Sequence, residues 1–154
     1  MFTREHLEQL ERLKCRYPTT KALTLHALWM AQKQFGWVSP EAMKYIAGLL
    51  NVPVHHVYGV VTFYTMFNTT PVGTYHLQVC TNVSCMLRGA EELCARLSQR
   101  LGIKVGETSA DKKFTLSEVE CLGSCGTAPM MQVNDDYHER LSETYVDQLL
   151  STLK

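Results

Sequence analysis

The sequence lacks both an excess of charge of either sign and any long apolar run. Lysine plus arginine and aspartate plus glutamate each number 15 among 154 residues, so electrostatic attraction gives no reason to expect nucleic acid or an anionic membrane surface as the main partner. No apolar stretch approaches the roughly 20 residues that a membrane-spanning helix needs, and we expect no insertion into a bilayer. These absences favour another protein as the partner.

The first residues also lack the pattern of a targeting segment. Residues 1–8 mix acidic and basic side chains and contain no apolar core, which argues against a secretory signal and a transit peptide. We therefore expect a cytoplasmic protein. In that reducing compartment, metal binding explains six cysteines better than three disulfides do.

Four of the cysteines stand in two close pairs. Cys80 and Cys85 are separated by four residues, Cys121 and Cys125 by three, and 35 residues lie between the pairs. Thiolates are soft ligands, and each pair can bind one iron of a two-iron cluster through two sulfurs. Residues 120–129 are small and glycine-rich, so this backbone can turn tightly and direct N–H groups at sulfur. The spacing favours one shared metal centre.

Paired cysteines also occur in structural zinc sites and in thiol-disulfide enzymes. Structural zinc is the strongest competitor, because tetrahedral sites with four cysteines also use pairs, although zinc ribbons usually repeat a similar short knuckle on each side. A thiol-disulfide enzyme requires two cysteines separated by two residues at a helix start. Neither pair has that spacing, so redox exchange is disfavoured, whereas zinc stays an alternative.

The remaining candidates have simpler interpretations. Cys94 lies among leucines and charged residues at helical spacing, where a cysteine most often serves as a small buried apolar group. Cys15 is expected to be an incidental free thiol with basic neighbours. His55 and His56 are adjacent, so on a helix they point about 100 degrees apart and cannot share one metal as residues four apart can.

Apolar residues recur at helical spacing from residue 4 to about residue 67. Proline, glycine and asparagine mark the expected helix ends in this half, and Ser39 before Pro40 is typical of a helix start. The pattern predicts four helices: from residue 4 to before Pro18, residues 21–35 ending at Gly36, residues 40–50, and residues 53–67.

The pattern changes after a break at residues 68–73, where alternating polar and apolar residues indicate strands. Met130 and Met131 would point to opposite faces of a strand, so core packing explains one of them. We expect strands at 75–79 and 114–120, a hairpin of 130–133 with 137–140, and helices at 87–101 and after Ser142. This order predicts a small mixed sheet covered by helices, with both cysteine pairs after adjacent strands.

Four segments carry a resemblance to a known family. The most specific are VCTNVSC at residues 79–85 and ECLGSCGTAPMMQVN at 120–134, and FGWVSPE at 35–41 and VYGVVTFYTMF at 57–67 agree with them. The chain resembles, over nearly its whole length, the NuoE-type subunits of the NADH dehydrogenase module of respiratory complex I, which are thioredoxin-like two-iron ferredoxins.

The resemblance implies a fold and a site. The fold is of the α+β class, with an N-terminal helical bundle at residues 1–70, expected to dock on the partner, followed by a thioredoxin-like α/β domain at residues 71–154. The implied ligands of a [2Fe-2S] cluster are Cys80, Cys85, Cys121 and Cys125. Backbone N–H groups near Gly123, Gly126 and residues 81–84 are expected to favour the reduced cluster.

The resemblance also implies partners. A NuoF-type flavoprotein would carry FMN and bind NADH, and the cluster of this chain would exchange electrons with that flavin. The chain would hold no catalytic residue and turn over no substrate alone, as an electron-carrying subunit in the peripheral arm of NADH:quinone oxidoreductase. Related subunits occur in NAD-linked hydrogenases and formate dehydrogenases, and the cysteine spacing does not distinguish these hosts.

Overall fold

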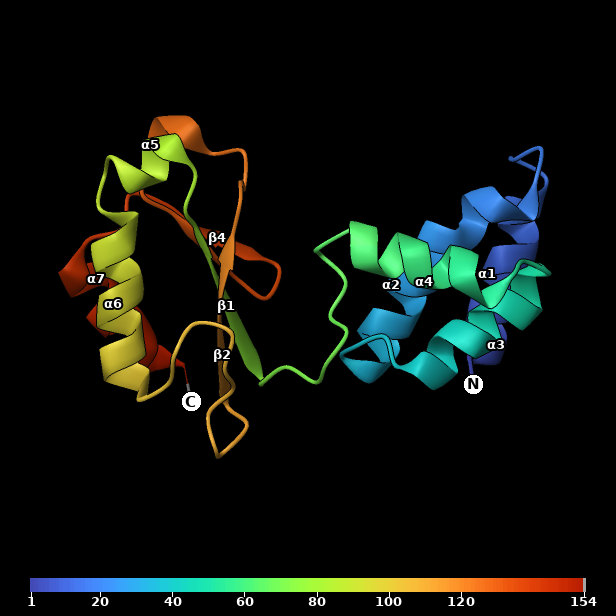
Figure 1. Ribbon diagram of the computed structural model, residues 1–154, viewed down its shortest axis with the longest axis horizontal. Coiled ribbons are helices and arrows are strands. Elements are labelled where there is room, and N and C mark those ends of the chain that lie inside the picture. Colours follow the sequence, from blue (N-terminus) through green and yellow to red (C-terminus); the bar gives the residue numbers. More distant parts are fainter. Residues whose placement is uncertain (154) are drawn as a thin grey trace. The chain divides into compact units, whose positions relative to one another are not determined.

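A computed structural model describes residues 1–153 of the chain, which fold as two compact units, residues 1–71 and residues 72–153 (Figure 1). The first is all helical and the second combines a sheet with helices. Within residues 1–153, none of the helices is both long and apolar enough to cross a bilayer.

The first unit is a bundle of four α-helices with a short 3-10 turn (Figure 1). The predicted helix signals act as expected: the Ser39 hydroxyl accepts a hydrogen bond from the Ala42 N–H at 3.1 Å, and Gly36 ends a helix at a φ of 79°. Leucine, alanine and valine side chains fill the interior. The elements are α1 (Arg4–Lys14), η1 (Thr20–Leu23), α2 (Thr24–Phe35), α3 (Pro40–Leu50) and α4 (Val54–Phe63).

The last of these helices is shorter than the sequence predicts. The expected segment runs to residue 67, but α4 ends at Phe63 and Tyr64 has extended backbone angles. The side chain of Gln32 holds the chain beyond this end, because its Nε2 donates to the Met66 carbonyl at 2.8 Å and its Oε1 accepts from the Asn68 N–H at 2.6 Å. These tertiary bonds favour a turn over further helix, in a segment whose aromatic and β-branched residues have low helix propensity.

The second unit contains a four-stranded mixed sheet in the order β2-β1-β3-β4. Strand β1 pairs in parallel with β2, and the pairs β1/β3 and β3/β4 are antiparallel. The mixed sheet and the fold class predicted from the sequence are confirmed. The elements are β1 (Tyr75–Cys80), α5 (Val83–Met86), α6 (Ala90–Leu101), β2 (Phe114–Val119), η2 (Cys125–Thr127), β3 (Met131–Val133), β4 (Asp136–His138) and α7 (Glu143–Thr152).

Two helices, α6 and α7, lie against the same face of this sheet (Figure 1). Leu77, Leu116 and Leu97 are fully buried between the sheet and α6. Arg96 links the two helices, since its guanidinium bonds Asp147 and Glu143 at 2.5 Å each. The opposite face carries polar side chains, such as His76, whose Nε2 lies 2.9 Å from the Ser117 hydroxyl.

Three elements of the second unit differ from expectation by more than one residue. A one-turn helix, α5, lies inside the first cysteine loop, where none was predicted, and α6 begins at Ala90 instead of residue 87. The Asn82 side chain caps α5 by accepting a hydrogen bond from the Val83 N–H. A helix of one turn is too short to show a periodic pattern of apolar residues, so the sequence pattern does not predict it. The last strand lies at Asp136–His138, earlier than the predicted 137–140, because Asn134 adopts a left-handed φ of 55° and tightens the turn.

Gly73 offers a test of how closely the segment before β1 packs on β2. A Cβ at Gly73 would lie 2.8 Å from the Lys113 carbonyl carbon and 2.9 Å from the Phe114 carbonyl carbon. We expect Gly73→Ala to lower the free energy of unfolding by about 1–3 kcal/mol, because backbone atoms must move. Urea denaturation followed by circular dichroism measures this.

The matched control is Gly48→Ala, at a position in α3 where a Cβ would meet nothing within 4 Å. Alanine there is expected to raise the free energy of unfolding by about 0.5–1 kcal/mol. Equal effects of the two substitutions would contradict the close packing at Gly73.

Candidate metal centre

The two cysteine pairs lie at one end of the sheet. Cys80 is the last residue of β1, and Cys121 comes two residues after the end of β2. Because β1 and β2 are adjacent and parallel, the loops that follow them leave the sheet at the same edge. The other members of the pairs, Cys85 and Cys125, lie in α5 and at the start of η2.

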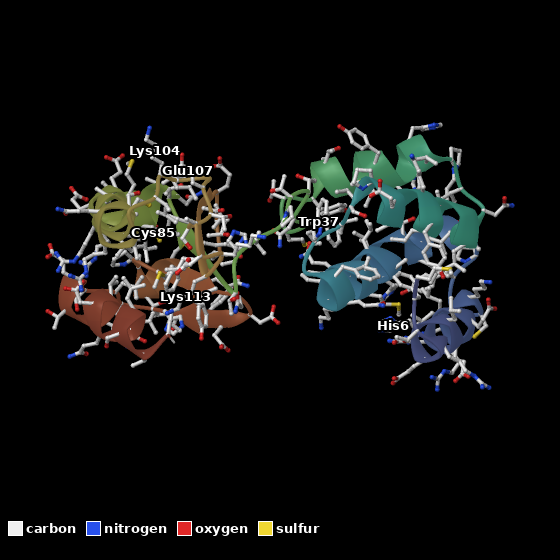
Figure 2. The ribbon with its side chains drawn as sticks, turned by 90° about the horizontal axis from the view of Figure 1, so that it is seen from below. His6, Trp37, Cys85, Lys104, Glu107 and Lys113 are labelled. Atoms are coloured by element: carbon white, nitrogen blue, oxygen red, sulfur yellow. The ribbon has the colours of Figure 1, made fainter. Side chains whose placement is uncertain are left out.

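The first pair is buried and the second is exposed. The relative exposure of Cys80 is 3% and that of Cys85 is 2%, whereas Cys121 and Cys125 are exposed. Figure 2 shows Cys85 within the outline of its unit, where it is buried, and Lys104 and Glu107 at the edge, where both are exposed. A small apolar cluster surrounds the buried pair, made of Ala90, Ala128 and Met130, with Val119 and Leu122 packed against it.

Met130 corrects one expectation. Core packing was expected for only one of Met130 and Met131, yet both have 0% exposure. Met131 packs under the helices, and Met130 points to the other face, where the cysteine loops cover it. Its backbone also takes part, since the Met130 carbonyl accepts from the Cys80 N–H at 3.2 Å. Alternation along the strand is therefore retained, but both faces are covered at this point.

Three of the four thiols interact electrostatically. Burial raises the pKa of Cys85 to about 11, and a hydrogen bond shared with Cys80 and the charges of Cys80 and Cys125 act in the same direction. A hydrogen bond from the Met130 backbone opposes them. Thiolates held this close repel one another, so the set is suited to a cation that neutralises them.

Cys121 has a backbone donor of its own. The Gly123 N–H donates to the Cys121 sulfur at 3.3 Å, and the φ of 76° at Gly123 is one that glycine adopts without steric cost. The N–H groups of residues 81–84 were expected to point at the cluster, but one of them is already used, because the Thr81 N–H donates to the Val119 carbonyl at 3.0 Å. That donor continues the strand ladder and is not directed at sulfur.

The donor set fits a two-iron cluster. Each loop supplies two thiols, and such a cluster takes two sulfurs on each iron, so the four sulfurs need not converge on one point. Among residues 1–153, no three side chains of histidine, cysteine, aspartate or glutamate converge closely enough for a single metal ion. The two pairs share one edge of the sheet without forming one compact group.

The other cysteines and histidines lie elsewhere. Cys94 lies on the buried face of α6 and is 5% exposed, as predicted. Burial, followed by the neighbouring Glu118, raises its pKa to about 12. Cys15 is exposed. His55 is exposed on α4, and the Nε2 of His56 lies 3.3 Å from the Thr24 hydroxyl.

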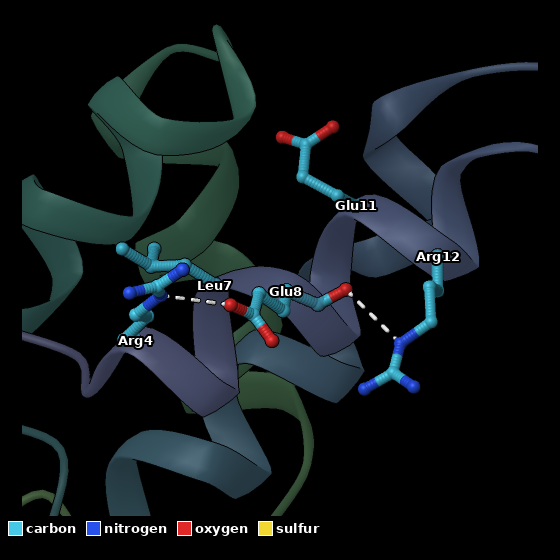
Figure 3. Close-up of a pocket in the computed structure, with 5 residues that line it drawn as sticks. All are labelled: Arg4, Leu7, Glu8, Glu11 and Arg12. Atoms are coloured by element: carbon cyan, nitrogen blue, oxygen red, sulfur yellow. Dashed lines mark hydrogen bonds and ion pairs between the residues drawn. The ribbon is translucent and has the colours of Figure 1, made fainter.

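A hollow along α1 is no competitor for the site (Figure 3). Leu7 and Glu11 line it with a charged row in which Arg4 Nε bonds the Glu8 carboxylate at 2.9 Å and Arg12 Nε bonds the Glu8 carbonyl at 3.4 Å. Arg4 and Glu8 form an ion pair typical of an exposed helix face, and Glu11 pairs with Lys14 at 2.5 Å. The charged groups of this hollow therefore already have partners on the same helix.

A second hollow adjoins the cysteines. Ser84, Arg88 and Gly126 line it together with Cys125, and the exposed apolar side chains of Val83, Met86 and Leu87 lie on the same loop. Sequence reasoning missed this edge, because a single turn of helix gives no periodic pattern. The site is therefore bordered by an apolar rim and one arginine.

Comparisons with known proteins agree with this geometry. The model of the thioredoxin-like [2Fe-2S] ferredoxin family matches residues 10–154. A NuoE-type subunit of the NADH-quinone oxidoreductase of Rhizobium meliloti (strain 1021) is 46% identical over 147 residues, covering 96% of this chain and 88% of that protein. The corresponding protein of Rickettsia typhi (strain ATCC VR-144 / Wilmington) is 43% identical over 152 residues, covering 97% and 89%.

The fold recurs in a solved structure. A chain of an NAD+-reducing [NiFe]-hydrogenase in the air-oxidized state superposes with a TM-score of 0.75 at 23% identity. The match covers 85% of this chain and 22% of that one, so the present chain corresponds to a small part of the hydrogenase chain. At this identity the likeness concerns the fold alone.

The burial of the cysteines predicts their order of alkylation in metal-free, reduced protein. At pH 8 a thiol with a pKa of about 11 is ionised in about one molecule in a thousand, and only the thiolate reacts. We therefore expect iodoacetamide to modify Cys121 and Cys125 well before Cys85 and Cys94, with the Cys85 rate rising up to pH 11. Mass spectrometry of peptides at timed intervals measures this, and equal rates for Cys85 and Cys121 at pH 8 would contradict it.

Proposed function

The chain belongs to the thioredoxin-like [2Fe-2S] ferredoxin family, and on that premise we propose that it is the electron-carrying NuoE-type component of an NADH-quinone oxidoreductase, or complex I. The observation that carries the proposal is the placement of two cysteine pairs after adjacent parallel strands. It occurs in a chain that is 43–46% identical to NuoE-type proteins of such oxidoreductases. The proposed ligands are Cys80, Cys85, Cys121 and Cys125.

A bound [2Fe-2S] cluster would supply one-electron redox chemistry. The chain's own residues hold and shield it. Cys80 and Cys85 offer sulfurs from inside the apolar cluster, which limits the access of water. The Gly123 N–H supports the Cys121 sulfur, and a donor to a ligating thiolate favours added negative charge on the centre.

The proposed partner is a flavoprotein of the NuoF type that carries FMN and binds NADH. The first unit holds no chemical motif, yet α4 exposes large apolar side chains: Val54 at 45%, Tyr58 at 58% and Phe63 at 76%. Such a surface is typical of an interface with another protein. We propose that the helical domain, residues 1–70, docks on the flavoprotein and that residues 71–154 carry the cluster, in a cytoplasmic peripheral arm.

The fold alone also fits another host. The likeness to an NAD+-reducing hydrogenase chain is compatible with an equivalent electron-carrying subunit of such an enzyme. A formate dehydrogenase stays an alternative host from the family resemblance. Purification of the native complex separates these hosts, because a quinone module, a hydrogenase or a formate dehydrogenase would accompany the flavoprotein. In each host the chain alone turns over no substrate.

Serine replacements test the ligand set. We expect Cys80→Ser, Cys85→Ser, Cys121→Ser and Cys125→Ser each to lose most of the iron and acid-labile sulfide and the visible absorbance, because oxygen is a poorer ligand for iron in such a cluster. Iron and sulfide analysis with EPR after dithionite measures this.

The controls are Cys15→Ser, at an exposed thiol, and Cys94→Ala, at a thiol buried in a separate core. Both are expected to keep a full cluster. Loss in Cys94→Ala with retention in Cys121→Ser would contradict the assignment. Stoichiometric zinc without iron in the wild-type protein would favour a zinc-stabilised adaptor over a cluster-bearing subunit.

The docking proposal is tested on α4. We expect Tyr58→Ser combined with Phe63→Ser to weaken the association with the flavoprotein at least tenfold, because aromatic side chains are enriched at interfaces and tyrosine is enriched among the residues whose truncation costs about 2 kcal/mol or more. Surface plasmon resonance on the full-length chain measures this. The control, Tyr145→Ser, removes a 40% exposed aromatic residue from α7, and an equal loss in the control would contradict docking through α4.

A further inference from the structure

The β3–β4 hairpin contacts the second cysteine loop, residues 121–125, through two side chains. The Tyr137 hydroxyl donates to the Leu122 carbonyl at 2.9 Å. Glu139, the first residue after β4, accepts hydrogen bonds from the Ser124 hydroxyl and, at 2.6 Å, from the Thr127 hydroxyl. Both contacts reach residues adjacent to proposed ligands, on a loop that is itself exposed.

A network within the loop joins these contacts. The Ser124 and Thr127 hydroxyls lie 2.6 Å apart, and the Thr127 N–H donates to the Ser124 carbonyl at 3.1 Å. The Arg140 N–H in turn donates to the Thr127 carbonyl at 2.8 Å. The hairpin and the residues that follow it therefore contact the loop on both sides of Cys125, through backbone and side-chain hydrogen bonds.

Glu139 is charged at neutral pH. The hydrogen bonds from Ser124 and Thr127 hold the pKa of its carboxyl below the usual range, with a smaller contribution from Arg140. The carboxylate also engages the two hydroxyls, so their protons are directed away from the cysteine sulfurs. A negative charge beside a centre that becomes more negative on reduction disfavours that reduction.

The two cysteine loops differ in their need for such support. The first is fixed by the apolar core around Cys80 and Cys85, whereas the second contains Gly123 at a positive φ and two exposed cysteines. An exposed loop with a glycine loses conformational freedom when it is ordered and gains little apolar burial in return. Groups that orient ligands usually come from outside the ligand loop.

We propose that Tyr137 and Glu139 are positioning residues for the metal centre, which fix the second cysteine loop from the hairpin, and that Glu139 also lowers the reduction potential of the bound cluster. The inference rests on the proposed function, since it requires a redox centre on these loops. It assigns roles to residues that bind no metal themselves and follow the last proposed ligand by 12 and 14 positions.

The test separates charge from hydrogen bonding in the full-length, cluster-loaded protein. Glu139→Gln keeps an acceptor for Ser124 and Thr127 but removes the charge, and Tyr137→Phe removes one hydrogen bond without any change of charge. Asp135→Asn is the matched control, because it removes an exposed carboxylate from the turn of the same hairpin. The readouts are the midpoint potential by EPR-monitored titration and the rate of iron loss to a chelator.

We expect Glu139→Gln to raise the midpoint potential clearly more than Asp135→Asn does, with nearly unchanged cluster content. Tyr137→Phe should speed iron loss several-fold and leave the potential near that of the wild type, and Glu139→Ala should show both effects. A Glu139→Gln potential equal to that of the control would overturn the electrostatic role. Iron loss at the wild-type rate in Tyr137→Phe and Glu139→Ala would overturn the positioning role.

These outcomes are distinct from failure of the proposed function. Wild-type protein that holds neither iron nor sulfide after anaerobic preparation would overturn the function and this inference together. If the wild-type protein holds the cluster but the Tyr137 and Glu139 variants have the same midpoint potential and the same rate of iron loss, only the inference is overturned.

Discussion

The parallel pairing of β1 with β2 is the interaction on which the site depends. The two strands are in register from Tyr75 opposite Phe114 to Cys80 opposite Val119, and the Thr81 N–H extends the ladder by one more bond to Val119 at 3.0 Å. The loops that follow the two strands therefore begin at the same edge of the sheet. The crossover through α6 covers one face of the pair, which is the arrangement a right-handed βαβ unit produces. Two cysteine pairs with 35 residues between them therefore lie at the same edge of the sheet.

The two halves of the site are built differently. Cys80 and Cys85 belong to a buried apolar cluster with Met130, so core packing fixes them. The second loop is exposed, and the hairpin side reaches it through the Tyr137 hydroxyl, which donates a hydrogen bond, and the Glu139 carboxylate, which accepts two. Apolar packing thus holds the first cysteine loop in place, and polar contacts hold the second. Both kinds of contact involve residues in or next to the strands of the same sheet. The exposed half is the one that a partner protein or a solvent ion can approach.

Most helices and strands could be predicted because each has a local signal. Ser39 and Pro40 start α3, Gly36 ends α2, and alternation marks β1. The end of α4 could not be predicted, because it depends on Gln32, which is more than 30 positions away in the sequence. The cysteine spacing indicated the four residues that we propose as ligands, whereas the burial of one pair and the contacts of Glu139 arise only from the folded chain. Periodicity describes one element at a time, and these features join several.

We infer that the paired strands present two sets of two thiols to one two-iron cluster. Native mass spectrometry of the anaerobically purified wild-type chain tests this most directly, because the added mass identifies the bound atoms. We expect one species with two irons and two sulfides per chain and with Cys80, Cys85, Cys121 and Cys125 protected from alkylation. A single zinc ion per chain, with no iron and no sulfide, would contradict it.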